Sequence, residues 1–483
     1  TRNHINVDRQ LLTFVLKKQY SSLGIDLPVS EETLLSDHTF TITTAHQPTL
    51  LTGALFHIYK IASVIHLTES LQTTYPEYQF LPVFIVSGED HDWAEVNHVY
   101  QFGKKYEWVR EASGPVGRLS TEGLEDLINS VSELFKNTPY GHELDIMLHD
   151  CLSNASTYNE FHFLLIHALF GHRGLIILNP DDADLKKSFV PIMEKEILDR
   201  FSYKAVTEVQ SELEKEGFKV QAFCRPINLF YLTEGKRERI DVSGDHLVRV
   251  DTGIKYTPEE LINELQHHPE QFSPNVILRP LYQEFILPNL AYIGGGGELA
   301  YWIDRKKQFE VAGVPYPMLI RRNSLLLIEP SVKSHLDKLG LRVLDLMMDS
   351  QQLIKSFLKK NSQTDLSYDE ELKQIENAYR ALSDKAHKID PTLSKSILAE
   401  ENKQVKAFEH LGSRLLRAEK QQQENQVKKI ERLKEKISPG GGLQERQENF
   451  MAYYATYGRT WIDNMIRICD PLVEKFIIVE LPQ

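Results

Sequence analysis

The strongest constraint on the fold is an apolar run over residues 80–86, Phe-Leu-Pro-Val-Phe-Ile-Val, in which no polar residue alternates with the apolar ones. A strand with one solvent-facing side alternates, whereas a strand covered on both faces is apolar throughout. The run therefore predicts a parallel strand inside an α/β sheet. It ends directly in Ser87-Gly-Glu-Asp-His-Asp92, so a charged cluster follows the carboxyl end of this strand.

Two other segments repeat the order of strand and then helix. Residues 39–45 are rich in β-branched side chains, and the apolar residues after them recur at helical spacing, at Leu55, Ile58, Tyr59, Ala62 and Ile65. Residues 174–180 form another apolar run, which precedes Asp181 and Asp182, two typical helix-start residues, and a helix to about residue 198. This alternation predicts a doubly wound parallel sheet.

Two stretches are too long for ordinary connections between core elements. The first predicts a helical insertion at about residues 99–170. The second, at about residues 202–274, has strand-like runs at 226–232 and around 240–242, and then Thr257-Pro-Glu-Glu260, which has the form of a capping box. Residues 314–322 are expected to form the last core strand. We therefore predict a catalytic core over residues 1–330.

The composition changes after residue 330, where Lys, Glu and Gln dominate. Apolar residues then recur at spacings of three and four, at Phe408, Leu411, Leu415, Ala418, Val427, Ile430 and Ile437. This pattern predicts a coiled-coil arm over residues 331–483, packed against helices at 345–360 and 367–388 or against a second subunit. A turn at residues 438–442 precedes a terminal helix at 450–468, which we expect to pack back on the core or the arm, and residues 476–479 could add a strand.

Charge and composition exclude several classes of protein. The 483 residues carry a formal net charge of −13, which disfavours nucleic acid as a partner, and the apolar share of 41% is that of a globular chain. No apolar run approaches the length of a membrane span, so we expect a cytoplasmic protein. Cys151, Cys224 and Cys469 are scattered and form no metal-binding pair. Arg225 beside Cys224 leaves a nucleophilic thiol as an open alternative.

The charged cluster after the second strand is the main candidate for chemistry. Glu89, Asp90, His91 and Asp92 lie where open α/β sheets bind ligands, and Asn97 and His98 follow shortly after. Such a cluster could bind an amine, hold a divalent cation or transfer protons. We favour the amine and proton roles and predict no metal, because adjacent residues seldom all face one ion. A solvated polar turn is the alternative.

Two further segments could bind anions. His46 ends the first strand, and Thr52 and Gly53 are expected to open the helix that carries His57 and Lys60, so that free N–H groups face a phosphate or carboxylate. Gly294, Gly295, Gly296 and Gly297 precede a second helix with Glu298, Tyr301 and Trp302. Arg279 and Gln283 precede this loop, and Arg321 and Arg322 end the last core strand. Each arginine could pair with a phosphate or carboxylate, or bridge surface acids. A flexible connector is the alternative for the glycines.

Together these motifs resemble the bacillithiol-pathway cysteine-adding family known as BshC. The resemblance rests on His46-Gln47-Pro, Leu51-Thr-Gly53-Ala-Leu55, Ile58-Tyr-Lys60, Glu89-Asp-His-Asp92, Glu95-Val-Asn-His98, Gly114-Pro-Val-Gly-Arg118, Arg225-Pro-Ile-Asn228-Leu-Phe-Tyr231 and Gly297-Glu-Leu-Ala-Tyr-Trp302. It extends over almost the whole chain. Gly88 and Gly296 depart from the residues common at these positions, and the segment 108–114 is short for the family.

The resemblance implies a Rossmann-like core, similar to class I aminoacyl-tRNA synthetases and nucleotidyltransferases, and a coiled coil that forms a homodimer. It also implies a ligase that joins cysteine to the amine of glucosaminyl-malate. From it we expect catalytic roles for His46 and Glu89–Asp92. Substrate binding is expected of Gln47, Gly53, Asn97, His98, Arg118, Arg225, Asn228, Arg279, Gln283, Glu298, Tyr301 and Trp302.

An amide does not form from a free carboxylate without activation, so we expect ATP to adenylate the cysteine. Nucleotide binding is then predicted for His46, Gly53, Lys60 and Gly294–Gly297, and proton transfer for the cluster at Asp90–Asp92. Two alternatives stay open: a non-catalytic nucleotide-binding scaffold, and a metal-dependent hydrolase that uses the acidic cluster.

Overall fold

The computed structural model describes residues 7–362, 364 and 366–482. They divide into two compact units, which are described separately. Unit 1 contains Thr1–Leu325 and Glu445–Ile477, and unit 2 contains Leu326–Gln444 and Ile478–Gln483.

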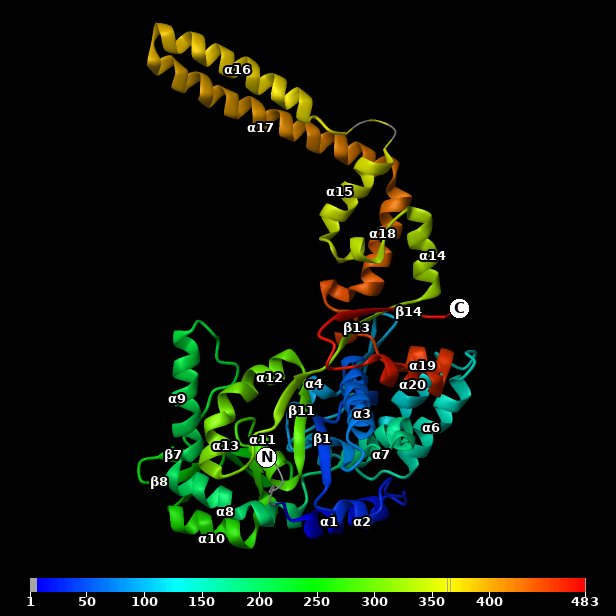
Figure 1. The fold of residues 1–483 in the computed structure, drawn as a ribbon, viewed down its shortest axis with the longest axis vertical. Helices are drawn as coiled ribbons and strands as arrows, with labels where there is room; N and C mark the ends of the chain where they lie inside the picture. Colours follow the sequence, from blue (N-terminus) through cyan, green and yellow to red (C-terminus); the bar gives the residue numbers. More distant parts are fainter. Residues whose placement is uncertain (1–6, 363, 365, 483) are drawn as a thin grey trace. The chain divides into compact units, whose positions relative to one another are not determined.

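Unit 1 is built on a five-stranded sheet in the order β12-β11-β1-β2-β5 (Figure 1). Its strands are β1 (Thr39–His46), β2 (Gln79–Val86), β5 (Ile176–Leu178), β11 (Asn289–Gly294) and β12 (Met318–Arg321). Every neighbouring pair is parallel, and β1 and β2 stay in register from Thr39 opposite Gln79 to His46 opposite Val86. The predicted doubly wound sheet is thus confirmed, and it reverses strand order beside β1.

Helices cover both faces of this sheet, which explains why its strands are apolar throughout. Figure 1 shows α3 (Phe56–Thr74) and α7 (Tyr158–Phe170) on one side, and α8 (Ala183–Asp199) and α11 (Arg279–Ile286) on the other. The remaining helices of the core are α1 (Arg9–Ser22), α2 (Glu31–Leu35), α4 (Trp93–Val96), α12 (Gly296–Trp302) and α13 (Lys306–Ala312). Asp182 caps α8 by accepting from the N–H groups of Asp184 and Leu185, as the sequence predicted.

The two insertions contain more strand than expected. The first has a hairpin of β3 (His98–Gln101) and β4 (Lys104–Glu107) before its helices α5 (Leu124–Ser132) and α6 (Gly141–Ser153). The second contains α9 (Phe201–Lys215), β6 (Leu229–Thr233), β7 (Lys236–Ser243), β8 (His246–Arg249), β9 (Lys255–Tyr256), α10 (Pro258–His267) and β10 (Phe272–Pro274). Its strands form one five-stranded sheet, and the predicted capping box at Thr257 and Glu260 is present.

The segment after the arm belongs to unit 1. It forms two helices rather than one, α19 (Met451–Tyr457) and α20 (Arg459–Ile468), because Gly458 between them has a positive φ of 63°. The two helices pack on α6 and α3 respectively.

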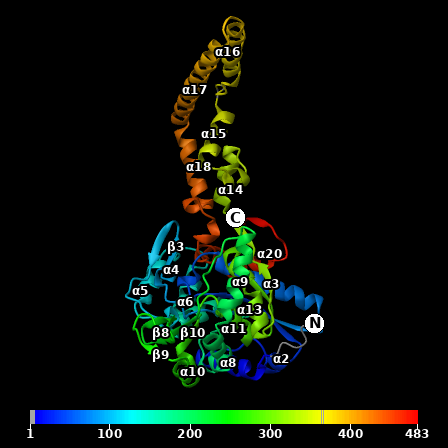
Figure 2. The same ribbon diagram turned by 90° about the vertical axis from the view of Figure 1, so that its left-hand side faces the viewer.

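Unit 2 contains the arm. Its helices are α14 (Pro330–Leu339), α15 (Ser350–Asn361), α16 (Asp369–Ile389), α17 (Pro391–Gln422) and α18 (Glu424–Ile437), and α16 and α17 lie side by side as a hairpin (Figures 1 and 2). Val427, Ile430 and Ile437 are buried with α14 and α15 in one apolar cluster. Leu411 and Leu415 on α17 remain 48% and 55% exposed. The predicted final strand is β14 (Phe476–Glu480), which pairs with β13 (Ser324–Ile328).

Candidate active site

A cleft of about 550 Å³ opens at the carboxyl ends of β1, β2 and β11. Ligands bind at such edges where strand order reverses, because the connections leave on opposite faces there. The polar side chains that line this cleft include His46, Gln47, Glu89, Asp90, Glu95, Arg237, Arg279, Gln283, Glu298, Tyr301, Arg322 and Arg446. Gly295, Gly296 and Gly297 complete its wall.

The acidic wall of the cleft follows β2. Glu89 pairs with the Lys186 ammonium at 2.6 Å, and its side chain is 12% exposed. Burial raises the pKa of Glu89, while Lys186 acts in the opposite direction. Asp90 accepts from Gln47 Nε2 and, at 3.4 Å, from Arg237 Nη1. The β2 end thus presents two fixed carboxylates to the cleft.

Three arginines form the basic wall. Arg279 is held by longer contacts of 3.4 Å to Gln283 Oε1 and to the Tyr301 hydroxyl. Arg322 donates to Glu445 at 2.8 Å. Arg446 is exposed, and within the described residues its guanidinium has no hydrogen-bond or ion-pair partner. This wall can receive an anion, because guanidinium groups bind carboxylates and phosphates well.

A buried ion pair lies beneath the glycine loop. Lys60, 1% exposed, donates to the carbonyl of Ala45 and pairs with Glu298 at 2.9 Å. Burial alone would raise the pKa of Glu298, but Lys60 and the N–H of Gly295 lower it to about 2. Glu298 lines the cleft, whereas Lys60 does not. The structure thus places Lys60 behind Glu298 and not at the cleft surface.

The turn between β1 and α3 differs from the prediction. The N–H groups of Thr52 and Gly53 donate to Thr49 and Leu50, and that of Leu55 donates to Glu448. The helix begins at Phe56, so the expectation of free N–H groups at Thr52 and Gly53 is wrong. Gly53 instead lines a second cavity of about 260 Å³, which shares His46, Gln47, Phe56, Glu95 and Arg446 with the cleft.

His46 heads a column of three imidazoles that leads into the core. Its ring stacks on His57 at 4.6 Å, and His57 packs on His162 at 5.2 Å. Burial lowers the pKa of His46 to about 4 and that of His162 to about 3, and places the pKa of His57 well below its usual value. His46 Nδ1 lies 3.0 Å from the Gln47 carbonyl, so Nδ1 is inferred to carry the proton and Nε2 to accept.

The other residues of the predicted cluster have local partners. Asp92 caps α4 by accepting from the N–H of Glu95, and exposed His91 lies 3.3 Å from Arg237. Asn97 is buried and donates to Glu107, while His98 lines the second cavity. Neither His91 nor Asp92 lines the cleft, although His91 Nδ1 lies 3.4 Å from Asp90 Oδ1.

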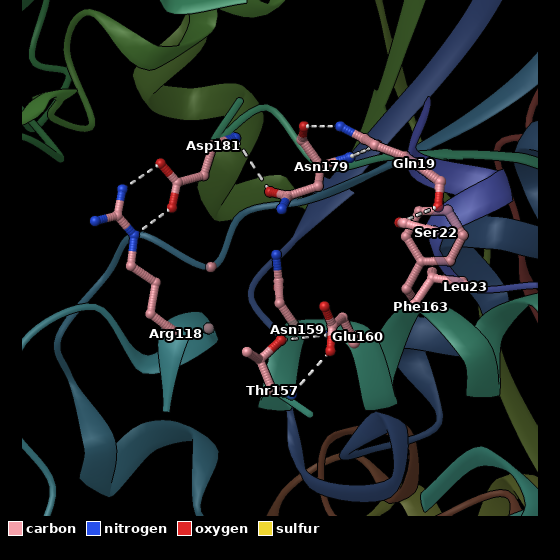
Figure 3. A pocket seen from close by; sticks show the side chains of 12 residues that line it. Gln19, Ser22, Leu23, Arg118, Thr157, Asn159, Glu160, Phe163, Asn179 and Asp181 are labelled. Atoms are coloured by element: carbon pink, nitrogen blue, oxygen red, sulfur yellow. Dashed lines mark hydrogen bonds and ion pairs between the residues drawn. The ribbon is translucent and has the colours of Figure 1, made fainter. Parts of the chain in front are cut away.

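Four further predicted residues also lie outside the cleft. Arg118 pairs with Asp181 at 2.7 Å beside a third cavity (Figure 3). Arg225 is exposed, and buried Asn228 donates to Glu196. Trp302 is buried and stacks on Tyr292 with ring centroids 4.3 Å apart. None of these four residues lines the cleft.

Sequence reasoning missed four charged residues of this region. Arg237 comes from β7 of the second insertion and Arg446 from the segment after the arm, and neither belongs to a motif that the sequence analysis singled out. Asp181 is predicted only as a helix-start residue, and Lys186 falls unnamed in the helix that follows. No local pattern marks Lys186 as a buried cation, because its partner Glu89 lies in another element.

Cys224 does not have the features of a nucleophile. Burial raises the pKa of its thiol to about 12, and Glu196 acts in the same direction. A thiol in this state stays protonated at neutral pH.

The fold and the cleft define a Rossmann-like α/β protein with a polar small-molecule site. Residues 1–323 match the family model described as "Bacillithiol biosynthesis BshC, N-terminal Rossmann-like domain", and residues 325–481 match the model of the BshC C-terminal coiled-coil domain. The chain therefore belongs to the BshC family.

Curated relatives agree with this assignment over nearly the full length. Proteins named "Putative cysteine ligase BshC" from Flavobacterium johnsoniae and Christiangramia forsetii are 37% and 38% identical, covering 99% and 98% of this chain and 90% and 89% of theirs. A Bacillus cereus relative of the same name is 30% identical over 90% of this chain and 83% of its own. One solved structure, of a Campylobacter jejuni protein assigned as an arginyl-tRNA synthetase, shares 12% identity with a TM-score of 0.24, over 95% of this chain and 90% of its own. A TM-score this low does not show a shared fold.

Within the described residues, no helix is long and apolar enough to cross a membrane.

Proposed function

We propose that this chain is a ligase that joins the carboxyl group of L-cysteine to the amine of glucosaminyl-malate. One observation carries the proposal: an acidic wall at Glu89 and Asp90 and a basic wall at Arg279, Arg322 and Arg446 line the same cleft. An acidic wall suits an ammonium group and a basic wall suits carboxylates and phosphates. The names of the relatives as cysteine ligases support the same reaction.

The reaction needs an activated carboxyl group, and we propose ATP as the co-substrate. A cysteine carboxylate oxygen attacks the α-phosphorus, pyrophosphate leaves, and cysteinyl-adenylate forms. The substrate ammonium gives one proton to Glu89 and becomes the free amine, which then attacks the carbonyl carbon. The C–O bond to AMP breaks, and the nitrogen releases a second proton to solvent. The products are the amide, AMP, pyrophosphate and two protons, so atoms and charge balance.

The residues of the cleft divide between these steps. Glu89 holds the substrate ammonium and accepts the proton, because burial raises its pKa toward the value that a general base needs. Neutral His46 offers Nε2 as a hydrogen-bond acceptor at the end of β1. Arg279, Arg322 and Arg446 hold the carboxylates and the phosphates.

We also propose a homodimer formed through the arm. The exposed apolar side chains Leu411 and Leu415 on α17 form part of a stripe with coiled-coil spacing, and such a stripe is stable when a second helix covers it. A second copy of the chain offers the same stripe.

The direct test combines purified protein, L-cysteine, glucosaminyl-malate and ATP, and detects the product by mass and the pyrophosphate by a coupled assay. We expect continuous pyrophosphate release only when both substrates are present, and at most about one equivalent per site with cysteine and ATP alone, because the adenylate then has no amine to react with. Glu89→Gln should lower the rate by roughly 100-fold, in the range of general-base removal, whereas Glu133→Gln at an exposed position should have no effect. Release of ADP and phosphate would point to an acyl phosphate instead of an adenylate. Substrate binding without product for any nucleoside triphosphate would refute the ligase and favour a binding scaffold.

A further inference from the structure

Lys186 is a buried cation that connects the cleft to a second part of unit 1. It lies in the first turns of α8 and is 1% exposed. Its ammonium group lies 2.6 Å from Glu89 Oε1 and 2.7 Å from Asp181 Oδ1, and donates to the Glu270 carbonyl at 3.2 Å. Two hydrogen bonds, to Asp181 and the Glu270 carbonyl, and the ion pair with Glu89 therefore fix the position of the ammonium group.

Asp181 is fixed from its other side. Arg118 donates to both of its oxygens at 2.7 Å, an arrangement that Figure 3 shows beside the cavity lined by Asn179 and Gln19. Burial would raise the pKa of Asp181, but Lys186 and Arg118 lower it to about 2. Asp181 is therefore a permanent anion. The four side chains form a row of alternating charge that runs from Arg118 to Glu89 in the cleft.

We infer that Lys186 is a positioning residue, which holds the Glu89 carboxylate at the cleft wall as the anion that receives the substrate amine. The inference rests on the proposed function only in the identity of that amine. The geometry that carries it is the pair of short contacts from one immobile ammonium group to Glu89 and to Asp181.

Other charged groups near Glu89 do not replace Lys186. Arg237 from β7 contacts Asp90 and lowers the pKa of Glu89 less than Lys186 does, and Arg118 contacts Asp181. Asp181 acts in the opposite direction and raises the pKa of Glu89. The neutral Tyr282 hydroxyl of α11 donates to the Pro180 carbonyl. Without Lys186, burial and Asp181 would raise the pKa of the Glu89 carboxyl group further and so favour its protonated form. A protonated carboxyl group no longer attracts an ammonium group.

The test measures the binding of glucosaminyl-malate by calorimetry from about pH 6.5 to about pH 9. At pH 7, Lys186→Met should weaken binding by roughly 10- to 100-fold, the range for a hydrogen bond to a charged group, and the loss should shrink as the pH rises. Every variant is measured with the same ligand. Dividing the Kd of a variant by that of wild type at each pH therefore cancels the effect of protonation of the ligand amine. Lys186→Arg should restore most of the binding. Lys187→Met, at the exposed neighbouring lysine, is the matched control and should behave as wild type.

Two further variants separate positioning from folding. Glu89→Gln should lose binding at every pH, and Lys186→Met should add nothing further to it. Asp181→Asn keeps the Lys186–Glu89 contact and should bind within about threefold of wild type. An equal loss in Asp181→Asn and Lys186→Met, or a loss in Lys186→Met that does not change with pH, would overturn the inference and assign the row of charges to folding alone.

Different binding results would refute the role of Lys186 and the proposed substrate. Unchanged binding in Lys186→Met with tight binding in wild type refutes only the role of Lys186. No binding of glucosaminyl-malate by wild type refutes the proposed substrate and this inference together.

Discussion

At the residue scale, burial controls the charge of the site. His46, His57 and His162 are stacked away from water, and burial lowers the pKa of each. His57 Nε2 and His162 Nε2 have no partner within the described residues, so protonating either ring would place an uncompensated charge in the core. The column is stable only in its neutral form.

This neutrality predicts that unit 1 loses stability in mild acid. The unfolded histidines titrate near pH 6.5 and the folded ones lower, so the stabilisation is present above about pH 6.5 and is lost as the pH falls toward 4. His162→Leu should reduce the loss between pH 7 and pH 5 by about 1–2 kcal/mol, and exposed His142→Gln should not. The fluorescence of Trp93, Trp108, Trp302 and Trp461 during urea unfolding reports this, because all four lie in unit 1. Equal acid sensitivity in both variants would refute the prediction.

At the element scale, the turn from β2 to α4 is set by close backbone packing. Gly88 donates its N–H to Val86, and its carbonyl accepts from the N–H of Gly117 at 2.8 Å. A Cβ on Gly88 would lie 2.6 Å from Asn159 Oδ1 and 3.0 Å from Gly117 Cα. Only glycine lets this turn approach Gly117 so closely, and the turn carries Glu89 and Asp90 into the cleft.

Gly88→Ala should therefore displace the two carboxylates without unfolding the chain. We expect a loss of roughly 10- to 100-fold in the ligation rate, because misplacement by about 1 Å costs up to that much. Gly442→Ala is the control, since its Cβ would meet its nearest atom at 3.6 Å. Adding Asn159→Ala removes one of the two clashes and should recover part of the rate. Full activity in Gly88→Ala would show that the turn tolerates the shift.

At the scale of the whole chain, the segment after the arm completes the cleft. Asn449 donates to the Leu51 and Gly53 carbonyls, and Glu445 accepts from Arg322, so the backbone around Arg446 is fixed against core elements. Arg446 lines both the cleft and the cavity beside it. An unpaired cation in this position fits the phosphates of the proposed nucleotide.

Arg446→Ala should weaken ATP binding by roughly 10-fold or more, the effect of removing a charge-assisted hydrogen bond, and Arg446→Lys should weaken it less. Equilibrium binding of ATP measures this. The control is Arg432→Ala on α18, at an exposed position of unit 2. Equal ATP affinity in Arg446→Ala and wild type would place the phosphates elsewhere.

The proposed dimer is tested on the arm itself. Leu411→Glu with Leu415→Glu should convert the dimer to a monomer in sedimentation velocity, because charges replace the apolar stripe. Ser413→Glu with Arg417→Gln changes the net charge by the same amount on the other face of α17, and should leave the dimer intact. A wild-type chain that sediments as a monomer would refute the proposal.

The sequence by itself determined the core strands β1, β2 and β5, the capped helices α8 and α10, and the place of Glu89 and Asp90 after β2. Strands buried on both faces must be apolar throughout, and the caps at Asp182 and Thr257 involve residues only a few positions apart. Signals of this kind are local, so they can be read along the chain. The motifs that resemble the BshC family are also short runs of neighbouring residues, so they too can be recognised along the chain.

Only the tertiary structure decided which charges meet. Lys186, Arg237 and Arg446 reach the cleft region from α8, from the second insertion and from the segment after the arm. His91 and Asp92, adjacent to Glu89 in sequence, do not line the cleft, because Asp92 caps α4. The physical reason is that a buried charge takes its partner from whatever element the packing brings within about 3 Å, and sheet order, not sequence distance, sets that element.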